Sequence, residues 1–194
     1  MNKAEKTRQF IIEKAAPVFN TKGYSGTSLS DMTEATGLTK GSIYGNFADK
    51  DEVALACFDY NTKCTQEVLT RHMARYTSYR DKLLVYPDVY SNSSKYGMPM
   101  GGCPVLNTTV DADDTHPALR AKAGEALIRW KDRLITLIEG GKTAGEFKPA
   151  VDAERTALTI IALLEGMIVI GRGTGKPAYA KAVIGSVEEL IKAL

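Results

Sequence analysis

Residues Thr27 to Val53 read TSLSDMTEATGLTKGSIYGNFADKDEV, and this stretch decides the fold. Ser28 followed by Asp31 has the spacing of a helix N-cap and its capping-box partner. Gly37 can adopt a positive φ at little cost, so the chain can reverse within about 3–4 residues there and begin a new helix. Thr39 is placed to cap that second helix. The pattern predicts two short helices joined by a tight turn.

A third helix start follows at once. Asp49 and Glu52 repeat the capping-box spacing, with Lys50 in the first turn. The arrangement predicts a helix-turn-helix whose second helix enters the major groove of DNA. Its hydroxyl, phenol, amide and ammonium groups suit phosphate oxygens and base edges. We expect phosphate contacts from Thr27, Thr39, Lys40, Tyr44 and Lys50, and expect Ser42 and Asn46 to lie nearest the base edges.

The stretch resembles the TetR family of bacterial transcriptional repressors. The resemblance continues backward through IIEKAAPVFNTKGYSGTS, where Ala15, Phe19, Gly23 and Tyr24 match a first helix packed over the helix-turn-helix. It covers roughly residues 8–56 well, and it implies an operator-binding dimer released by a small-molecule effector. Gly45 and Asn46 depart from the family pattern, so the operator sequence cannot be carried over.

Composition places the chain among ordinary globular proteins. Of its 194 residues, 44% are hydrophobic and 25% charged, and the net charge is +2. Three cysteines without a C-x-x-C spacing favour a reducing cytoplasm over a secreted disulfide fold. The N-terminal residues have no apolar signal region, and the apolar run 157–170 looks too short to cross a bilayer. We therefore expect a cytoplasmic protein without a membrane partner.

Helical periodicity continues through the rest of the chain, which predicts an all-α protein. We expect a DNA-binding domain over residues 1–48 and a helical ligand-binding and dimerisation domain over residues 49–194. Ser91–Gly102 is rich in Ser, Gly, Met and Pro and is expected to be a loop. Helices are expected over residues 4–21 with a bend at Pro17, from residue 49 or 50 to beyond Arg71, over 81–91 with an interruption at Pro87, and over 104–110, 117–142, 152–171 and 177–194.

The helix over residues 152–171 is apolar on nearly all sides and needs cover on more than one face. A second copy of the chain can provide that cover, and a fully intramolecular core is the alternative. We expect a homodimer in which this helix and the one over residues 177–194 form half of a four-helix bundle, as the resemblance also implies.

Aromatic and methionine side chains in the second domain suggest a cavity for an apolar or aromatic effector. Core packing is the competing explanation for each of them. Glu165, in an apolar helix, can meet either a ligand cation or an arginine. The candidate lining residues are Tyr60, Tyr86, Tyr90, Met98, Met100, Cys103, Asn107, Trp130, Glu165 and Met167.

No pattern in the sequence predicts a catalytic site, a cofactor or a metal site. GRGTGK at residues 171–176 lacks the leading glycine and the hydroxyl residue of a phosphate-binding loop, and it is expected to connect two helices. Cys103 precedes an expected helix start, where a thiol pKa is lowered. Two alternatives therefore stay open beside the repressor: a helical small-molecule-binding protein that no longer reads DNA, and a Cys103-dependent sensor or enzyme.

Overall fold

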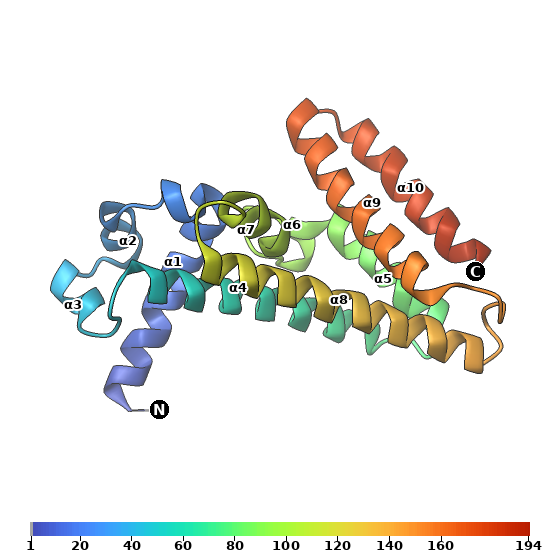
Figure 1. Cartoon of the computed structure of the whole chain (residues 1–194), viewed down its shortest axis with the longest axis horizontal. Coiled ribbons are helices and arrows are strands. Elements are labelled where there is room, and N and C mark those ends of the chain that lie inside the picture. The colour runs from blue at the N-terminus through green and yellow to red at the C-terminus, as the bar shows by residue number, and fades with distance from the viewer. Residues whose placement is uncertain (1) are drawn as a thin grey trace. The chain divides into compact units, whose positions relative to one another are not determined.

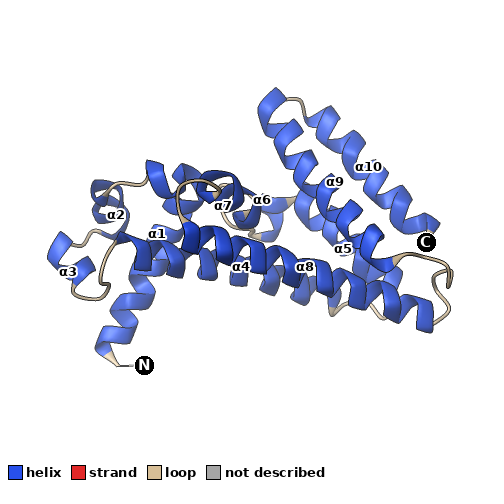
Figure 2. Cartoon of the chain, viewed as in Figure 1, coloured by secondary structure: helices blue, strands red, loops and turns tan. Residues whose placement is uncertain are grey.

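The computed structural model describes residues 2–194, which form ten helices and no strand (Figures 1 and 2). The all-α prediction is confirmed. The three N-terminal helices are α1 (Lys3–Gly26), α2 (Leu29–Thr36) and α3 (Lys40–Tyr44). The remaining helices are α4 (Lys50–Met73), α5 (Tyr79–Ser91), α6 (Ser93–Tyr96), α7 (Pro104–Ala112), α8 (Pro117–Thr143), α9 (Ala153–Thr174) and α10 (Pro177–Ala193).

Side-chain caps define the helix starts at the N-terminal end. Ser28 and Asp31 form the predicted capping box on α2, and Gly37 ends that helix with a φ of 68°. The Thr39 hydroxyl accepts a hydrogen bond from the Ser42 N–H at the start of α3. Asp49 accepts from the Glu52 N–H at the start of α4. Each cap satisfies a backbone donor that the helix itself leaves unpaired.

The break in the first helix falls at Gly23. Its φ of 73° and ψ of 175° are non-helical, so Tyr24–Gly26 form a separate turn. Pro17 lies inside the helical part, and no non-helical residue occurs beside it. Glycine tolerates the conformation at position 23 because it has no Cβ.

Two local predictions about the middle of the chain are wrong. Pro87 does not interrupt its helix, because α5 is continuous from Tyr79 to Ser91 and the proline is buried within it. The expected loop over 91–102 contains the short helix α6, which Gly97 ends with a φ of 72°. Pro87 has no backbone N–H group to donate within the helix, and packing of the buried face of α5 offsets the free-energy cost of that lost hydrogen bond.

The chain forms two compact units, residues 1–65 with 99–126, and residues 66–98 with 127–194. The long helices α4 and α8 therefore contribute to both. The first unit has a core that α1, α2, α3, α4, α7 and the start of α8 share, with Ile11, Met32, Ile43, Phe47 and Val53 nearly or fully buried. This core fixes the positions of the two short helices of the helix-turn-helix.

The second unit contains α5, α6, α9 and α10 with the adjoining parts of α4 and α8. α10 packs along α9 and also against α5, and Figure 1 shows α9 and α10 as an antiparallel pair. Glu146 joins the start of α5 to this unit, because its carboxylate accepts hydrogen bonds from the backbone N–H groups of Tyr79 and Arg80. These bonds hold the pKa of Glu146 below its ordinary value.

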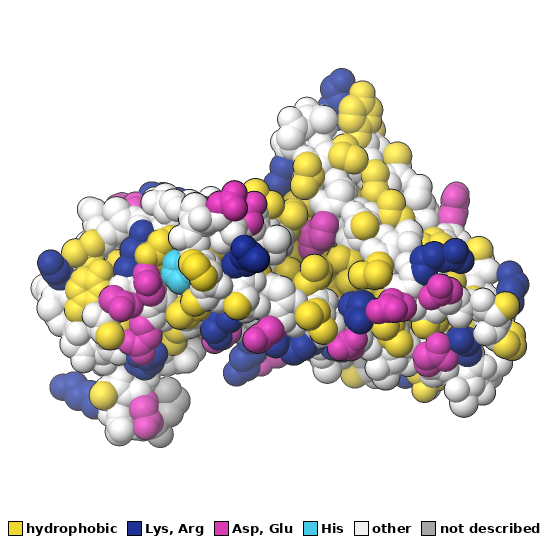
Figure 3. Space-filling view, in the orientation of Figure 1, with side chains coloured by type: hydrophobic (Ala, Val, Ile, Leu, Met, Phe, Trp, Pro, Cys, Tyr) yellow, Lys and Arg dark blue, Asp and Glu magenta, His cyan; other side chains and the backbone are white. Residues whose placement is uncertain are grey.

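By length and composition, α9 is the one helix among residues 2–194 that could cross a membrane. This helix is longer than the apolar run 157–170 on which the expectation from the sequence was based. The same composition is found in core and interface helices of soluble proteins, and about 33% of the apolar window is buried within the chain. Apolar side chains gather over α9 and α10 in Figure 3.

Candidate DNA-binding interface and ligand-domain residues

The start of α3 presents a small polar surface. Thr39 and Lys40 are exposed, Ser42 and Tyr44 are half-exposed, and Ile43 is fully buried in the core of the first unit. The buried isoleucine therefore anchors α3 with its polar residues outward. Cations and hydroxyl groups beside a helix start suit the phosphate oxygens of DNA.

Asn46 lies beyond the end of α3, which stops at Tyr44 with Gly45 as its C-cap. Asn46, which was expected to lie nearest the base edges together with Ser42, is therefore outside the helix that carries Ser42. Its amide donates to the Ser42 carbonyl oxygen at 2.9 Å, so one of its donors is used within the chain. The side chain is half-exposed, and its carbonyl oxygen still leaves an acceptor for a base edge.

Thr27 does not present its side chain to a phosphate. It is 1% exposed, and its hydroxyl donates to the Gly23 carbonyl oxygen at 2.6 Å. A hydroxyl used and buried in this way stabilises the turn before α2. The structure thus assigns Thr27 a structural role in place of the expected side-chain contact with DNA.

Lys50 stands at the start of α4 over the ring of Tyr24, with its Nζ atom 4.3 Å from the ring centroid. The Tyr24 hydroxyl donates to Asp51, and this bond, together with burial, raises the pKa of Tyr24 to about 12. The His116 ring contacts Tyr24 edge-on, with 4.5 Å between ring centroids. These contacts hold the cation in one place while its charge stays available to an anion.

Arg8 braces the turn between α3 and α4. Its guanidinium donates to the Asn46 carbonyl oxygen at 2.6 Å and to Glu52 at 2.7 Å, and it lies 3.9 Å from the centroid of the Phe47 ring. The Ala48 N–H and Arg8 together hold the pKa of Glu52 below its ordinary value. This role of Arg8 is not predictable from the sequence, since Arg8 precedes Glu52 by 44 positions and nothing local marks the pair.

A second set of contacts ties α1 to the segment that leads into α7. The Asn20 amide donates to the carbonyl oxygens of Met100 at 2.7 Å and Gly102 at 3.0 Å. The Asn107 amide donates to the carbonyl oxygens of Asn20 at 2.9 Å and Gly101 at 2.8 Å. Close to these bonds, Asp111 on α7 accepts from the Tyr24 N–H at 2.6 Å. We call these contacts the α1–α7 latch.

The ten predicted ligand-lining residues do not form one group. Tyr60, Met100, Cys103 and Asn107 belong to the first unit, and the other six belong to the second. Asn107 is part of the α1–α7 latch, Tyr60 packs against the first core, and Met100 is 66% exposed. The small cavity under α1, α4 and α7 has about 20 Å³ of space, which is room for about one water molecule. Of these four residues, Asn107 lines this small cavity, and Met100 lines a wider, more open surface pocket of about 290 Å³ beside α1 and α2.

In the second unit, three predicted residues form a ring cluster. Tyr86 and Tyr90 on α5 lie nearly parallel to Trp130 on α8, with interplanar angles of 16° and 19°. Met167 on α9 is buried as well, whereas Met98 and Glu165 are half-buried. Glu165 interacts with other groups of the chain.

Cys103 is 2% exposed and precedes α7 without a side-chain cap bond. A reactive cysteine needs a solvent-exposed thiol, and the thiol of Cys103 is almost fully buried. Cys57 is also buried, which raises its thiol pKa. Among residues 2–194, no group of three or more His, Cys, Asp or Glu side chains is placed to hold a metal ion.

Comparison with known proteins agrees with this geometry. Residues 11–57 match the model of the tetR family of bacterial regulatory proteins, and residues 80–187 match that of the tetracyclin repressor-like C-terminal domain. A crystal structure of a TetR-family regulator from Cytophaga hutchinsonii is 52% identical, with a TM-score of 0.96 over 100% of this chain and 97% of that one. Another, from Chloroflexus aurantiacus, is 36% identical with a TM-score of 0.91 over 98% and 96%.

Curated relatives are more distant. The regulator TtgR of Pseudomonas putida is 25% identical over 85% of this chain and 80% of its own length. An HTH-type regulator from Lactococcus lactis is matched over 57% of this chain and 60% of its own length. The chain belongs to the TetR family of transcriptional regulators, whose typical member is a ligand-responsive DNA-binding repressor and not an enzyme.

Proposed function

We propose that this protein is a cytoplasmic homodimeric repressor that binds a near-palindromic operator through α3 and the start of α4, and that a small molecule bound in the second unit releases it. The observation that carries the proposal is the polar surface of α3, anchored from beneath by Ile43 and capped by Thr39. Such a surface fits the major groove, and a twofold dimer places two copies about 34 Å apart, on one side of the duplex.

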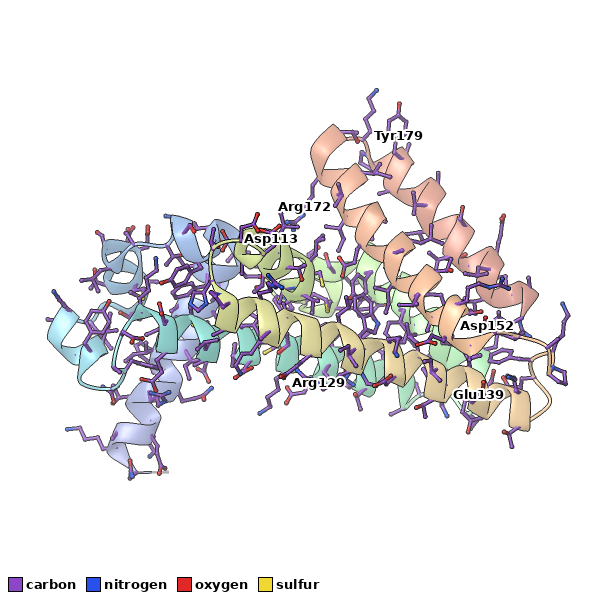
Figure 4. All side chains as sticks on the ribbon, in the orientation of Figure 1. Asp113, Arg129, Glu139, Asp152, Arg172 and Tyr179 are labelled. Atoms are coloured by element: carbon purple, nitrogen blue, oxygen red, sulfur yellow. The ribbon has the colours of Figure 1, made fainter. Side chains whose placement is uncertain are left out.

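The proposed dimer contact is the outer face of α9 and α10. α9 buries Ile160, Leu164 and Met167 within its own chain. It also leaves Leu158 49%, Val169 57% and Ile170 39% exposed. Tyr179, at the start of α10, is 48% exposed and points away from both ribbons in Figure 4. Apolar side chains gathered on one face favour pairing with a second copy in a four-helix bundle.

The proposed switch has two states. In the free state the two α3 helices match successive major grooves, and an effector favours a state in which they do not. Coupling of this kind is typically worth about 1–3 kcal/mol, which is 5- to 150-fold in DNA affinity. The hydrogen bonds of the α1–α7 latch connect α7 directly to α1, the first helix of the DNA-binding region.

The test is binding to the DNA upstream of the protein's own gene, measured across a range of salt concentrations. Lys40 is exposed, so Lys40→Ala removes a charge while disturbing little of the packing. We expect weaker binding and a salt slope smaller by about 0.9 for each phosphate that the variant no longer neutralises. Lys95→Ala, an exposed lysine on α6 outside the proposed DNA and dimer contacts, is the matched control and should leave the slope unchanged. Equal slopes for wild type and Lys40→Ala would contradict the proposed reading surface.

The two alternative functions make different predictions. A helical binding protein that no longer reads DNA would show weak binding with no sequence preference. A Cys103-dependent enzyme would lose turnover in Cys103→Ser, but the burial of this thiol does not favour that mechanism.

A further inference from the structure

Tyr24, near the end of α1, is contacted by residues on or beside three other helices of the first unit. Its backbone N–H donates to Asp111 on α7, and its hydroxyl donates to Asp51 on α4. The ring of His116, which directly precedes α8, contacts the Tyr24 ring edge-on with 4.5 Å between centroids. Lys50 holds its ammonium group 4.3 Å from the centroid of the same tyrosine ring. Tyr24 therefore connects Lys50, a proposed DNA contact, to helices that carry no proposed DNA contact themselves.

The His116 side chain is fixed in its place by burial and by one hydrogen bond. It is 7% exposed, and its Nδ1 atom accepts from the Leu119 N–H at 3.2 Å, which makes His116 the N-cap of α8. Because Nδ1 is the acceptor of this bond, the neutral imidazole carries its proton on Nε2. The ring of Tyr24 thus packs against a group that has little freedom to turn.

The cap bond alone does not explain a histidine at position 116. Its Nε2 atom is buried and has no hydrogen-bond partner in the part of the chain that the structure describes. Asp51 Oδ1 lies 3.7 Å away, beyond hydrogen-bonding distance, and already accepts from the Tyr24 hydroxyl. A buried donor without a partner is costly, and a serine or an aspartate would cap α8 without that cost. The contact with the Tyr24 ring is what only an aromatic side chain supplies here.

We propose that His116 is a positioning residue for DNA binding: its ring holds Tyr24 in place, and Tyr24 in turn holds the ammonium group of Lys50. An ordered lysine binds a phosphate more tightly than a mobile one, because it has already lost the rotamer freedom that binding removes. The start of α8, a helix that continues into the second unit, thereby influences DNA affinity without touching DNA. The inference rests on the proposed function in one respect, namely that Lys50 contacts DNA.

The positioning itself is tested on the full-length protein without DNA. The ε-methylene group of Lys50 carries the ammonium group that lies over the Tyr24 ring, so the ring current should move its resonance upfield in a proton–carbon correlation spectrum. The spectrum of Lys50→Ala identifies that resonance. His116→Asn keeps a cap for α8 and removes the ring, so the resonance should return toward its ordinary position. His116→Phe keeps a ring without the cap bond and should retain the upfield shift.

The other histidine of the chain supplies the matched control. His72, in the second unit, makes the same kind of edge contact with Tyr96, at 4.4 Å between ring centroids. His72→Asn should therefore leave the Lys50 resonance where it is in the wild type. A Lys50 resonance that stays upfield in His116→Asn, or that is not shifted in the wild type, would refute the positioning role whatever the protein does with DNA.

A double-mutant cycle then tests whether His116 acts on DNA binding through Lys50. The probe is the DNA upstream of the protein's own gene. Alone, His116→Asn should weaken binding roughly 2- to 13-fold for each subunit, which corresponds to the ordering of one long side chain. In a Lys50→Ala background the same change should have no further effect, since the lysine to be positioned is gone. In a Lys40→Ala background it should keep its full effect.

The results distinguish this inference from the proposed function. If His116→Asn keeps its full effect in the Lys50→Ala background, the histidine acts by another route and the inference is overturned, although the operator is bound. If the wild type shows no sequence preference for DNA while the Lys50 resonance still responds to His116→Asn, the repressor function is the part that fails, and the positioning of Lys50 by His116 is supported.

Discussion

Replacing Gly23 by alanine should destabilise the protein through two separate effects. The residue has a φ of 73° and a ψ of 175°, a region that is open almost only to glycine. A Cβ atom at this position would lie 2.7 Å from Asp111 Oδ1 and 2.8 Å from Asp111 Cγ. Asp111 cannot move away freely, because its other oxygen accepts from the Tyr24 N–H at 2.6 Å.

The size of the effect follows from these two terms. A non-glycine residue in this region costs about 1–3 kcal/mol, and the displaced carboxylate adds part of one hydrogen bond. We expect a loss of about 2–4 kcal/mol in the free energy of unfolding. For a chain of this length, each kcal/mol lowers Tm by about 2–4 °C, so Tm should fall by roughly 4–16 °C.

The assay is thermal unfolding followed by circular dichroism at one fixed protein concentration, with Gly124→Ala as the control. Gly124 lies in the exposed interior of α8, and an added Cβ would meet nothing within 4 Å. Alanine there should stabilise the helix by about 0.5–1 kcal/mol. The same exchange should thus have opposite signs at the two positions.

A third variant separates strain from steric clash. In an Asp111→Ala background the clash is absent, so Gly23→Ala should there cost only the backbone term of about 1–3 kcal/mol. If Gly23→Ala leaves Tm within about one degree of wild type, the reasoning about the break in α1 is refuted. A decrease of equal size in Gly124→Ala would refute it as well.

Three further outcomes follow from the caps and from the exposed face of α9. Thr39→Ala should lower the unfolding free energy in urea by about 1 kcal/mol, because α3 loses its cap bond to Ser42, whereas Thr39→Ser should not. Glu146 has a pKa below its ordinary value because of the backbone N–H groups at the start of α5, so its contribution is present above the unfolded pKa of about 4.3 and is lost as pH falls through the lower folded value. The stability gap between wild type and Glu146→Gln should therefore close in acid, and a gap that widens would contradict this account. Leu158→Lys should convert the dimer to a monomer in light scattering without lowering helicity, and an unchanged mass would exclude Leu158 from the dimer contact.

Local rules predicted the helix starts well. The Ser28–Asp31 capping box, the Thr39 cap and the Asp49–Glu52 pair all depend on residues three positions apart, and each occurs in the structure. Contacts over such short distances are visible in a sequence because the chain has little freedom between them. The composition of α9, which is apolar on nearly all sides, did not show which face is buried within the chain, and the structure buries the face that carries Ile160, Leu164 and Met167.

Long-range contacts were not predictable in the same way. Nothing near Asp111 marks it as the acceptor for the Tyr24 N–H, because the two residues are 87 positions apart. The continuity of α5 through Pro87 was missed for a related reason. A proline that costs a helix one donor can remain where the surrounding side chains are buried, and that burial comes from elements distant in sequence.

The division of the candidate ligand residues shows most clearly where sequence reasoning stops. α8 carries one regular apolar stripe from Leu119 to Leu134, yet Leu119 belongs to the core of the first unit, whereas Trp130 faces Tyr86 and Tyr90 in the second. Spacing tells which side chains share a helix face but not which neighbours cover each part of that face. Asn107 illustrates the same limit, since an amide that could orient a ligand is used here to bind backbone carbonyl oxygens. Only the contact geometry separates a polar group that is already paired from one, such as the Trp130 indole, that still requires a partner.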